Sequence, residues 1–102
     1  MRLCDLDDVM AIERVCFAAP WSRQVFIDEL ERDWARVDVL KERGSDGARA
    51  VAFCNYWLVH DEVHVLNLAT HTLARRRRYA SRLMTHVIEF ARRHKCRYIT
   101  LE

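Results

Sequence analysis

Four consecutive arginines, Arg75 to Arg78, are the densest group of charged side chains in the sequence. They stand directly before a segment, beginning at Tyr79, whose apolar residues recur with helical spacing. A helix N-terminus carries about half a positive charge and several unpaired N–H groups, so the turn that enters it is suited to phosphate. Arginine side chains add bidentate donors for phosphate oxygens. We therefore predict that this turn binds a phosphorylated anion.

The arginine run also fits two other interpretations, a nucleic-acid contact and a solvated helix end without a ligand. For an isolated run, the solvated end would rank first. Residues 75–97 hold nine lysines and arginines against a single acid, Glu89, and this asymmetry predicts a specific anion or an acidic partner. The aromatic residues near it are dispersed, unlike the stacking platforms of nucleic-acid-binding folds. These residues are Tyr56, Trp57, Tyr79 and Tyr98.

The elements that must position the basic turn follow from hydrophobic periodicity. Helical spacing is found over residues 5–17, over 23–33 with Ser22 as N-cap, and from Tyr79 to near His94. Alternation and turn residues predict a hairpin of 36–42 and 49–60 around the glycine turn 43–47, then a strand 62–70 and a final buried strand 96–102. The apolar stripe of the last helix is expected to comprise Ala80, Leu83, Met84, Val87, Ile88 and Ala91.

This order, ααβββαβ, predicts one α/β domain over residues 1–102, with a mixed sheet flanked by helices. The strand, basic turn, helix and strand at the end form a βαβ unit, whose outer strands should be parallel. Because the chain ends at Glu102 on a strand expected to be interior, we expect either a fragment or a partner chain that completes the sheet. Such an oligomer would form through residues 96–102.

Composition indicates an ordinary soluble protein, with 51% hydrophobic and 31% charged residues. No apolar run approaches the roughly 20 residues of a membrane span, and the start lacks the pattern of a signal peptide. We therefore expect a cytoplasmic protein without a membrane partner. The four cysteines form no C-x-x-C pair and are expected to be reduced and mostly buried. His60 and His64 should share one face of a strand, but without a third ligand nearby no metal is assigned.

Three stretches of the sequence, taken in their order along the chain, form a recognisable pattern. The segment CFAAPWSRQVFIDEL (16–30) carries an F-x-x-P-W-S-like pattern, DEVHVLNLATH (61–71) is a strand, and RRRRYASRLM (75–84) approximates Q/R-x-x-G-x-G/A. Together with YITLE (98–102), they resemble the GNAT superfamily of acetyl-CoA-dependent N-acetyltransferases. The resemblance is strongest to the RimI branch, the ribosomal-protein N-terminal alanine acetyltransferases. It covers nearly the whole chain and implies a GNAT-like mixed sheet that lacks the family's closing C-terminal elements.

The resemblance implies a role for each matching residue. The strand backbone of Leu68, Ala69 and Thr70 would line the pantetheine arm and the thioester carbonyl, and a bulge would free one N–H group for the developing oxyanion. The pyrophosphate would be held by Arg75, Arg76, Arg77, Arg78, Tyr79, Ala80 and Ser81. Glu102 would be the general base, and the alternative interpretation is a frayed terminal residue. Pro20, Trp21 and Ser22 would shape the peptide side, while also serving as helix cap and packing anchor.

The activity implied is transfer of the acetyl group of acetyl-CoA, a co-substrate, to the α-amino group of a protein or peptide, by direct attack in a ternary complex. A ribosomal protein starting with alanine is the implied partner. Two departures bear on this activity: Arg78 replaces the first glycine of the loop, and the family's later elements, with their general-acid tyrosine, do not follow Glu102. The alternatives are a basic nucleic-acid or ribosome-binding module and a non-catalytic interaction domain that uses the strand 96–102.

Overall fold

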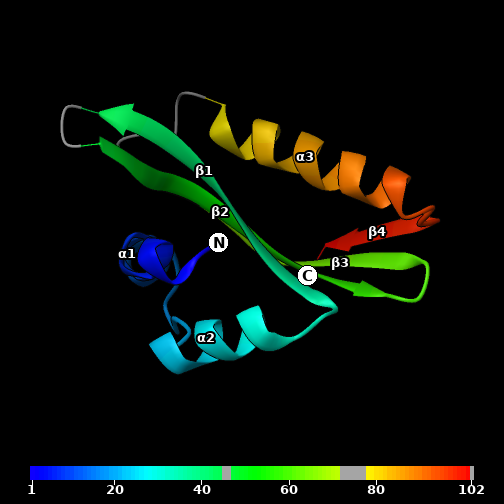
Figure 1. Ribbon diagram of the computed structural model, residues 1–102, viewed down its shortest axis with the longest axis horizontal. Coiled ribbons are helices and arrows are strands. Elements are labelled where there is room, and N and C mark those ends of the chain that lie inside the picture. Colours follow the sequence, from blue (N-terminus) through cyan, green and yellow to red (C-terminus); the bar gives the residue numbers. More distant parts are fainter. Residues whose placement is uncertain (45–46, 72–77, 102) are drawn as a thin grey trace.

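The structure, a computed structural model, describes residues 1–44, 47–71 and 78–101. A four-stranded mixed sheet lies between helices on its two faces (Figure 1). The elements are a short 3-10 turn Leu3–Asp5, α1 Leu6–Cys16, α2 Arg23–Glu31, β1 Ala35–Gly44, β2 Gly47–Val59, β3 Glu62–Thr70, α3 Tyr79–Arg93 and β4 Tyr98–Leu101. The predicted fold class and the order ααβββαβ are confirmed.

The sheet has the strand order β1-β2-β3-β4. The pairs β1/β2 and β2/β3 are antiparallel, whereas β3 and β4 are parallel and are joined through α3, as predicted for the βαβ unit. The turn between β2 and β3 contains His60, whose φ of 55° lies in the left-handed region. His60 and His64 therefore do not share a strand face, and that expectation is wrong.

Two apolar cores fill the space on either side of the sheet. Helices α1 and α2 cover one face, and α3 covers the other (Figure 1). The first core consists mainly of Leu6, Val9, Ile12, Phe26, Val37, Phe53 and Ala69. The second contains Cys54, Tyr56, Val63, Val65, Leu83, Val87 and Phe90. Neighbouring residues of β2 thus point to opposite cores, as strand alternation requires.

The apolar stripe of α3 differs from the predicted one. Ala80 is exposed and Ile88 is 37% exposed, whereas Tyr79 and Phe90 are buried. The face that meets the sheet runs through Tyr79, Leu83, Val87 and Phe90, a helical repeat that leaves Ile88 at its flank. The basic side chains of the helix point away from this face.

The final strand was expected to be buried, and this is wrong. Tyr98 is 60% exposed and Leu101 is 71% exposed. Within the described residues β4 pairs with β3 alone, so it is an edge strand of the sheet. The four cysteines are free thiols, as expected, but the expectation that most are buried is wrong, because only Cys54 is buried.

Candidate functional site

The central feature is the point where β3 and β4 separate. The two strands are paired from Glu62 with Tyr98 to Val65 with Leu101, and β3 then continues to Thr70. At this point β3 also carries a β-bulge, because Asn55 pairs with Asn67 while Tyr56 pairs with Val65. The extra residue is Leu66. Beyond Val65, no strand in the described part of the chain pairs with the outer edge of β3.

Particular backbone groups face this open edge. The N–H of His71 donates to the carbonyl of Val51 at 2.6 Å, so His71 turns its backbone groups toward β2. Backbone groups alternate in direction along a strand, so those of Leu68 and Thr70 point away from β2, and those of Ala69 face β2. The Thr70 carbonyl already accepts the Cys16 thiol at 3.5 Å, so at this residue only the N–H is offered to a ligand. The side chain of Ala69 is buried beneath α1. From Leu66 to Thr70 the edge is about 13 Å long, and it offers both donors and acceptors to a ligand.

The open edge leads to the N-terminus of α3. The first helical hydrogen bond joins the Arg82 N–H to the Arg78 carbonyl at 3.1 Å, so the N–H groups of Tyr79, Ala80 and Ser81 have no partner within the helix. Ala80 and Ser81 are exposed, and Tyr79 anchors the turn by its buried ring. This is the arrangement of an anion site at a helix start. The predicted ligands Arg75, Arg76 and Arg77 lie outside the described residues.

Arg78 is the N-cap of α3 and has φ 59° and ψ 29°, which is left-handed backbone. This region costs a residue other than glycine about 1–2 kcal/mol. It is the position where the resembling loop pattern has its first glycine. The backbone therefore keeps a glycine-type conformation although the side chain is arginine.

The predicted peptide-side residues lie in the connection between α1 and α2. The Ser22 hydroxyl accepts the Val25 N–H at 3.3 Å, and the ring centroid of Trp21 lies 5.4 Å from that of Phe26. The expected helix cap and packing anchor are thus confirmed. Pro20 is exposed beside them.

A buried carboxylate, missed by the sequence analysis, holds this connection. Oε2 of Glu13 accepts the Trp21 N–H at 2.7 Å, and Glu13 is 1% exposed. Its second oxygen, Oε1, is buried without a hydrogen-bond partner among the described residues. Burial raises the pKa of Glu13, and the bond from Trp21 opposes part of that rise. The sequence gives one sign of this burial, because Glu13 is adjacent to Ile12 on the side of α1 that faces the core.

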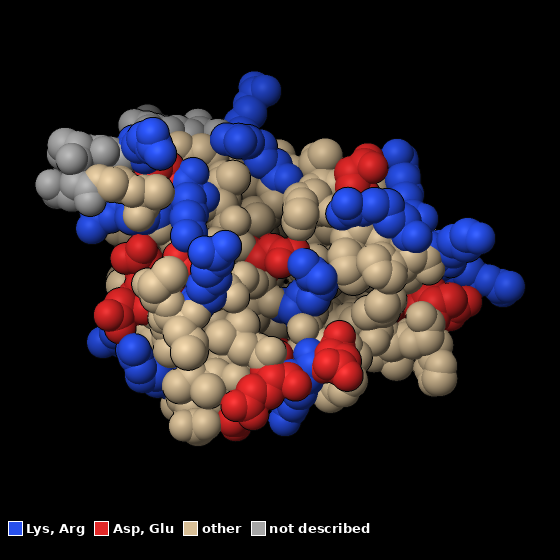
Figure 2. Space-filling model, viewed as in Figure 1, with Lys and Arg blue, Asp and Glu red and all other residues tan. Residues whose placement is uncertain are grey.

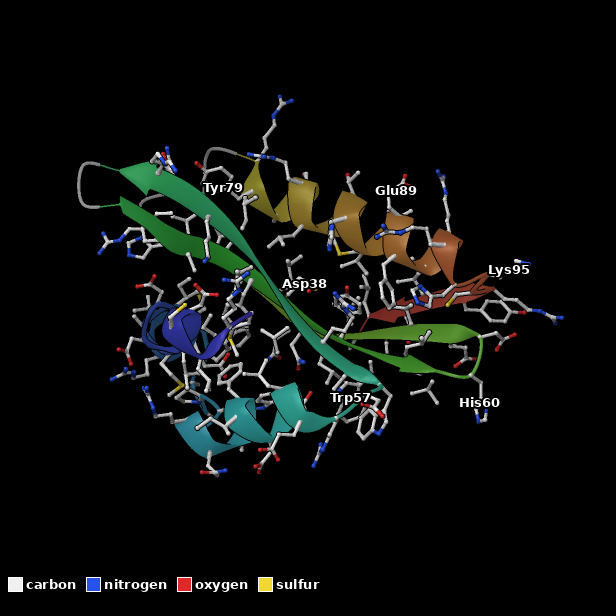
Figure 3. All side chains as sticks on the ribbon, viewed as in Figure 1. Asp38, Trp57, His60, Tyr79, Glu89 and Lys95 are labelled. Carbon is white, nitrogen blue, oxygen red and sulfur yellow. The ribbon has the colours of Figure 1, made fainter. Side chains whose placement is uncertain are left out.

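A second buried acid, Glu29 of α2, orders the sheet surface near the bulge. It accepts the indole N–H of Trp57 at 2.8 Å and the side-chain amide of Asn55 at 3.1 Å, and it pairs with Arg32 at 3.0 Å. Figure 3 shows Trp57 near the end of β2, on the side of α2. This polar cluster keeps part of the sheet face hydrophilic where it leaves the cover of α2.

His64 extends the same polar face toward β4. Its Nε2 lies 3.0 Å from Oε2 of Glu62, and its Nδ1 lies 3.0 Å from Oγ1 of Thr100. Val63 and Val65, on either side of it, are buried in the core under α3, so His64 points to the opposite face. Sequence analysis considered His64 only as a metal ligand and did not connect it with Thr100.

The charge distribution is consistent with an anion site at the start of α3. Figure 2 shows lysine and arginine side chains over the α3 side of the molecule. Farther along, some of them are paired, as in Arg92 with Glu89 at 3.5 Å and Arg97 with Asp61 at 3.2 Å. Figure 3 shows Glu89 on the outer side of the C-terminal half of α3, and Lys95 at the turn that follows this helix. In the described ranges, no helix is long and apolar enough to cross a membrane.

Comparison with known proteins gives a consistent family. The model of the acetyltransferase (GNAT) family matches residues 6–102. A Bacillus subtilis (strain 168) protein, provisionally named ribosomal protein bS18-alanine N-acetyltransferase, is 29% identical over an alignment of 103 positions, which covers all of this chain and 66% of the relative. The chain therefore spans slightly less than two thirds of the length of this curated relative.

Solved structures share the fold. The ribosomal-protein-S18-alanine N-acetyltransferase of Escherichia coli has a TM-score of 0.78 at 23% identity, over 92% of this chain and 57% of that one. NAA60 of Arabidopsis thaliana, in complex with a bisubstrate analogue, has a TM-score of 0.84 at 16% identity, over 99% of this chain and 70% of that one. At these identities the likeness concerns the fold.

Proposed function

The chain belongs to the acetyltransferase (GNAT) family, and from that premise we propose that it transfers the acetyl group of acetyl-CoA to the α-amino group of a protein or peptide. The observation that carries this proposal is the open edge of β3, which starts at the bulge of Leu66 and ends near the N-terminus of α3. A ligand with a long polar arm and a phosphorylated end fits this combination. Acetyl-CoA has both parts.

We assign the binding of acetyl-CoA to backbone groups at two places, the open edge of β3 and the start of α3. Leu68 and Thr70 would hold the pantetheine arm by hydrogen bonds of the kind that a neighbouring strand would make. The first N–H groups of α3, with Arg75 to Arg78, would hold the pyrophosphate. An N–H group near the bulge would stabilise the negative charge on the thioester oxygen during attack.

The amino group would approach from the face of α1 and α2. Pro20, Trp21 and Ser22 would form one side of this approach, with the loop fixed by Glu13. Glu102, which lies outside the described residues, would accept the proton that the nitrogen loses after it has attacked the thioester carbon. The names of the Bacillus and Escherichia coli relatives support an alanine-starting ribosomal protein as acceptor, and hence the cytoplasm as the site of action.

The test begins with calorimetric titration of acetyl-CoA into the purified chain, with and without competing RNA. We expect one saturable site per chain that RNA does not displace. Mass spectrometry of an alanine-starting peptide, incubated with chain and acetyl-CoA, should then show a single added acetyl group. The matched control peptide carries a formylated α-amino group and should stay unmodified.

The possible results separate the functional classes. Binding of RNA in place of acetyl-CoA, with a steep loss of affinity as salt rises, would support a nucleic-acid-binding module instead. A folded chain that binds neither acetyl-CoA nor RNA would contradict both the proposed cofactor site and the nucleic-acid interpretation.

A further inference from the structure

We propose that His64, held between Glu62 and Thr100, forms a proton relay that removes the first proton from the attacking amino group. This inference rests on the proposed acetyl transfer and adds a residue for which the sequence patterns gave no catalytic role. Its basis is a hydroxyl, an imidazole and a carboxylate in one chain of contacts, with 3.0 Å on each side of the imidazole. Such a chain can move a proton over two hydrogen bonds.

The relay lies where the reaction needs a proton acceptor. His64 pairs with Thr100 in the register of β3 and β4, one pair before the last one, Val65 with Leu101. The open edge begins at Leu66, directly after this last pair. The thioester end of a ligand on that edge would therefore lie within a few residues of Thr100, which is exposed.

The relay is also open to water, which it needs in order to release the proton. The side chain of His64 is 26% exposed and that of Glu62 is 40% exposed. Both lie on the face opposite α3, where the peptide approach is proposed. A buried histidine with the same contacts would hold its proton inside the protein, whereas this one can return it to solvent.

The Thr100 oxygen takes a proton from the substrate ammonium, directly or through one water, while its own proton passes to Nδ1 of His64. The imidazolium formed is stabilised by the carboxylate of Glu62 at Nε2. The neutral amine then forms the new C–N bond, the C–S bond breaks, and the second proton of the nitrogen ends on the leaving thiolate. The imidazolium gives its proton to water, so the net products are amide, thiol and one proton.

In the described part of the chain, few charged groups lie on the sheet face that carries His64. On β3 the partner is Glu62, and on β4 Thr100 and the phenol of Tyr98 share its face by strand alternation. On β2 its register partner is Trp57, which engages Glu29 of α2. The carboxylate directly bonded to His64 is thus that of Glu62.

The test measures kcat/KM for the alanine-starting peptide against pH, in wild type and in His64→Gln, Thr100→Val and Glu62→Gln. We expect His64→Gln and Thr100→Val to lower kcat/KM about a hundredfold or more at neutral pH, and less above the pKa of the peptide α-amino group, about 7.7–8.0, where the amine needs no base. Glu62→Gln should lower kcat/KM at neutral pH less than His64→Gln does, since it removes the partner of the imidazole and keeps the imidazole itself. Affinity for acetyl-CoA should stay unchanged in all three.

The matched control is His86→Gln. His86 also has a carboxylate partner, Asp38 at 2.9 Å, but it belongs to α3 on the other face of the sheet. This variant should keep the wild-type rate and pH profile. If wild type transfers acetyl and His64→Gln matches it in both, the relay is wrong and the proposed function stands. If wild type binds acetyl-CoA and transfers nothing at any pH, both are wrong.

Discussion

At the scale of single residues, Arg78 is the clearest conflict between side chain and backbone. It adopts φ 59° at the start of α3, a left-handed backbone conformation that is strained for arginine and not for glycine. Arginine also adds a Cβ and a long side chain to a turn that, in the proposed site, must approach a phosphate closely. The residue therefore combines a favourable charge with an unfavourable shape.

We expect Arg78→Gly to tighten acetyl-CoA binding about tenfold, roughly the value of one hydrogen bond to a charged group. Removal of the Cβ lets the backbone approach the pyrophosphate, and the other arginines still supply positive charge. The unfolding free energy should rise by up to about 1 kcal/mol, because glycine adopts this φ without strain. Calorimetry and urea unfolding measure the two effects.

Lys95→Gly is the matched control for this change. Lys95 also has a positive φ, 55°, and it follows the other end of α3. Both variants remove a basic side chain from left-handed backbone, so both should gain stability. Only Arg78→Gly should change the affinity for acetyl-CoA, and equal affinities in the two variants would contradict the proposed placement of the pyrophosphate.

At the scale of elements, a negative charge in the first turn of α3 has opposite effects on the stability of the helix and on the proposed binding of a pyrophosphate. An acid there stabilises the helix through its macrodipole, typically by about 0.3–1 kcal/mol. The same negative charge would repel a pyrophosphate held by the N–H groups. Ala80 is exposed in this turn and touches neither core, so it can be changed without repacking.

We expect Ala80→Glu to make the protein slightly more stable while weakening acetyl-CoA binding about tenfold, as like charges at close range would. The neutral variant Ala80→Gln should leave both properties near wild type. Thermal unfolding and calorimetric titration provide the two readouts. Unchanged affinity in Ala80→Glu would remove the start of α3 from the proposed site.

The sequence predicted the elements well because each depends on local pattern. The strand over 62–70 and the helix from Tyr79 are found with those starts, and Ser22 caps α2 as expected. Burial of β4 was predicted wrongly, since whether a strand lies at an edge depends on its neighbours in the sheet. The second helix ends at Glu31, two residues early, where the chain turns into β1.

The site was predictable only in part. The loop pattern pointed to the start of α3, but the contact of His64 with Thr100 joins residues 36 apart in sequence, and it arises only from the parallel pairing of β3 and β4. Similarly, Glu13 and Glu29 look like surface acids on amphipathic helices. Their burial depends on which backbone and side-chain donors the rest of the fold brings to them.

At the scale of the whole molecule, the sheet separates two cores, and one of them contains an acid. Glu13 is buried in the layer of α1 and α2, and one of its oxygens has no hydrogen-bond partner among the residues that the structure describes. Since burial raises its pKa, the folded protein holds this proton at pH values where the unfolded chain has lost it. The free energy of unfolding should therefore fall as pH rises from about 4, near the ordinary value for glutamate, through the raised pKa of Glu13.

We expect Glu13→Gln to remove this part of the pH dependence. Near pH 4 the variant and wild type should be similar in stability, and the variant should become relatively more stable as pH rises to 7. Urea unfolding at several pH values measures the difference. Glu31→Gln, which changes an exposed acid of α2, is the control, and a pH dependence in Glu13→Gln equal to that of wild type would contradict the proposed cost of the buried charge.

The arrangement of the tryptophans gives the protein an internal optical probe. Its three indoles are Trp21 in the connection before α2 and the edge-to-face pair Trp34 and Trp57, with ring centroids 5.0 Å apart. Trp57 lies opposite His64 in the β2–β3 register, so the two side chains are cross-strand neighbours. An imidazolium quenches indole emission more strongly than a neutral ring does. The fluorescence of Trp57 therefore reports the protonation of His64, without a label and in the presence of substrate.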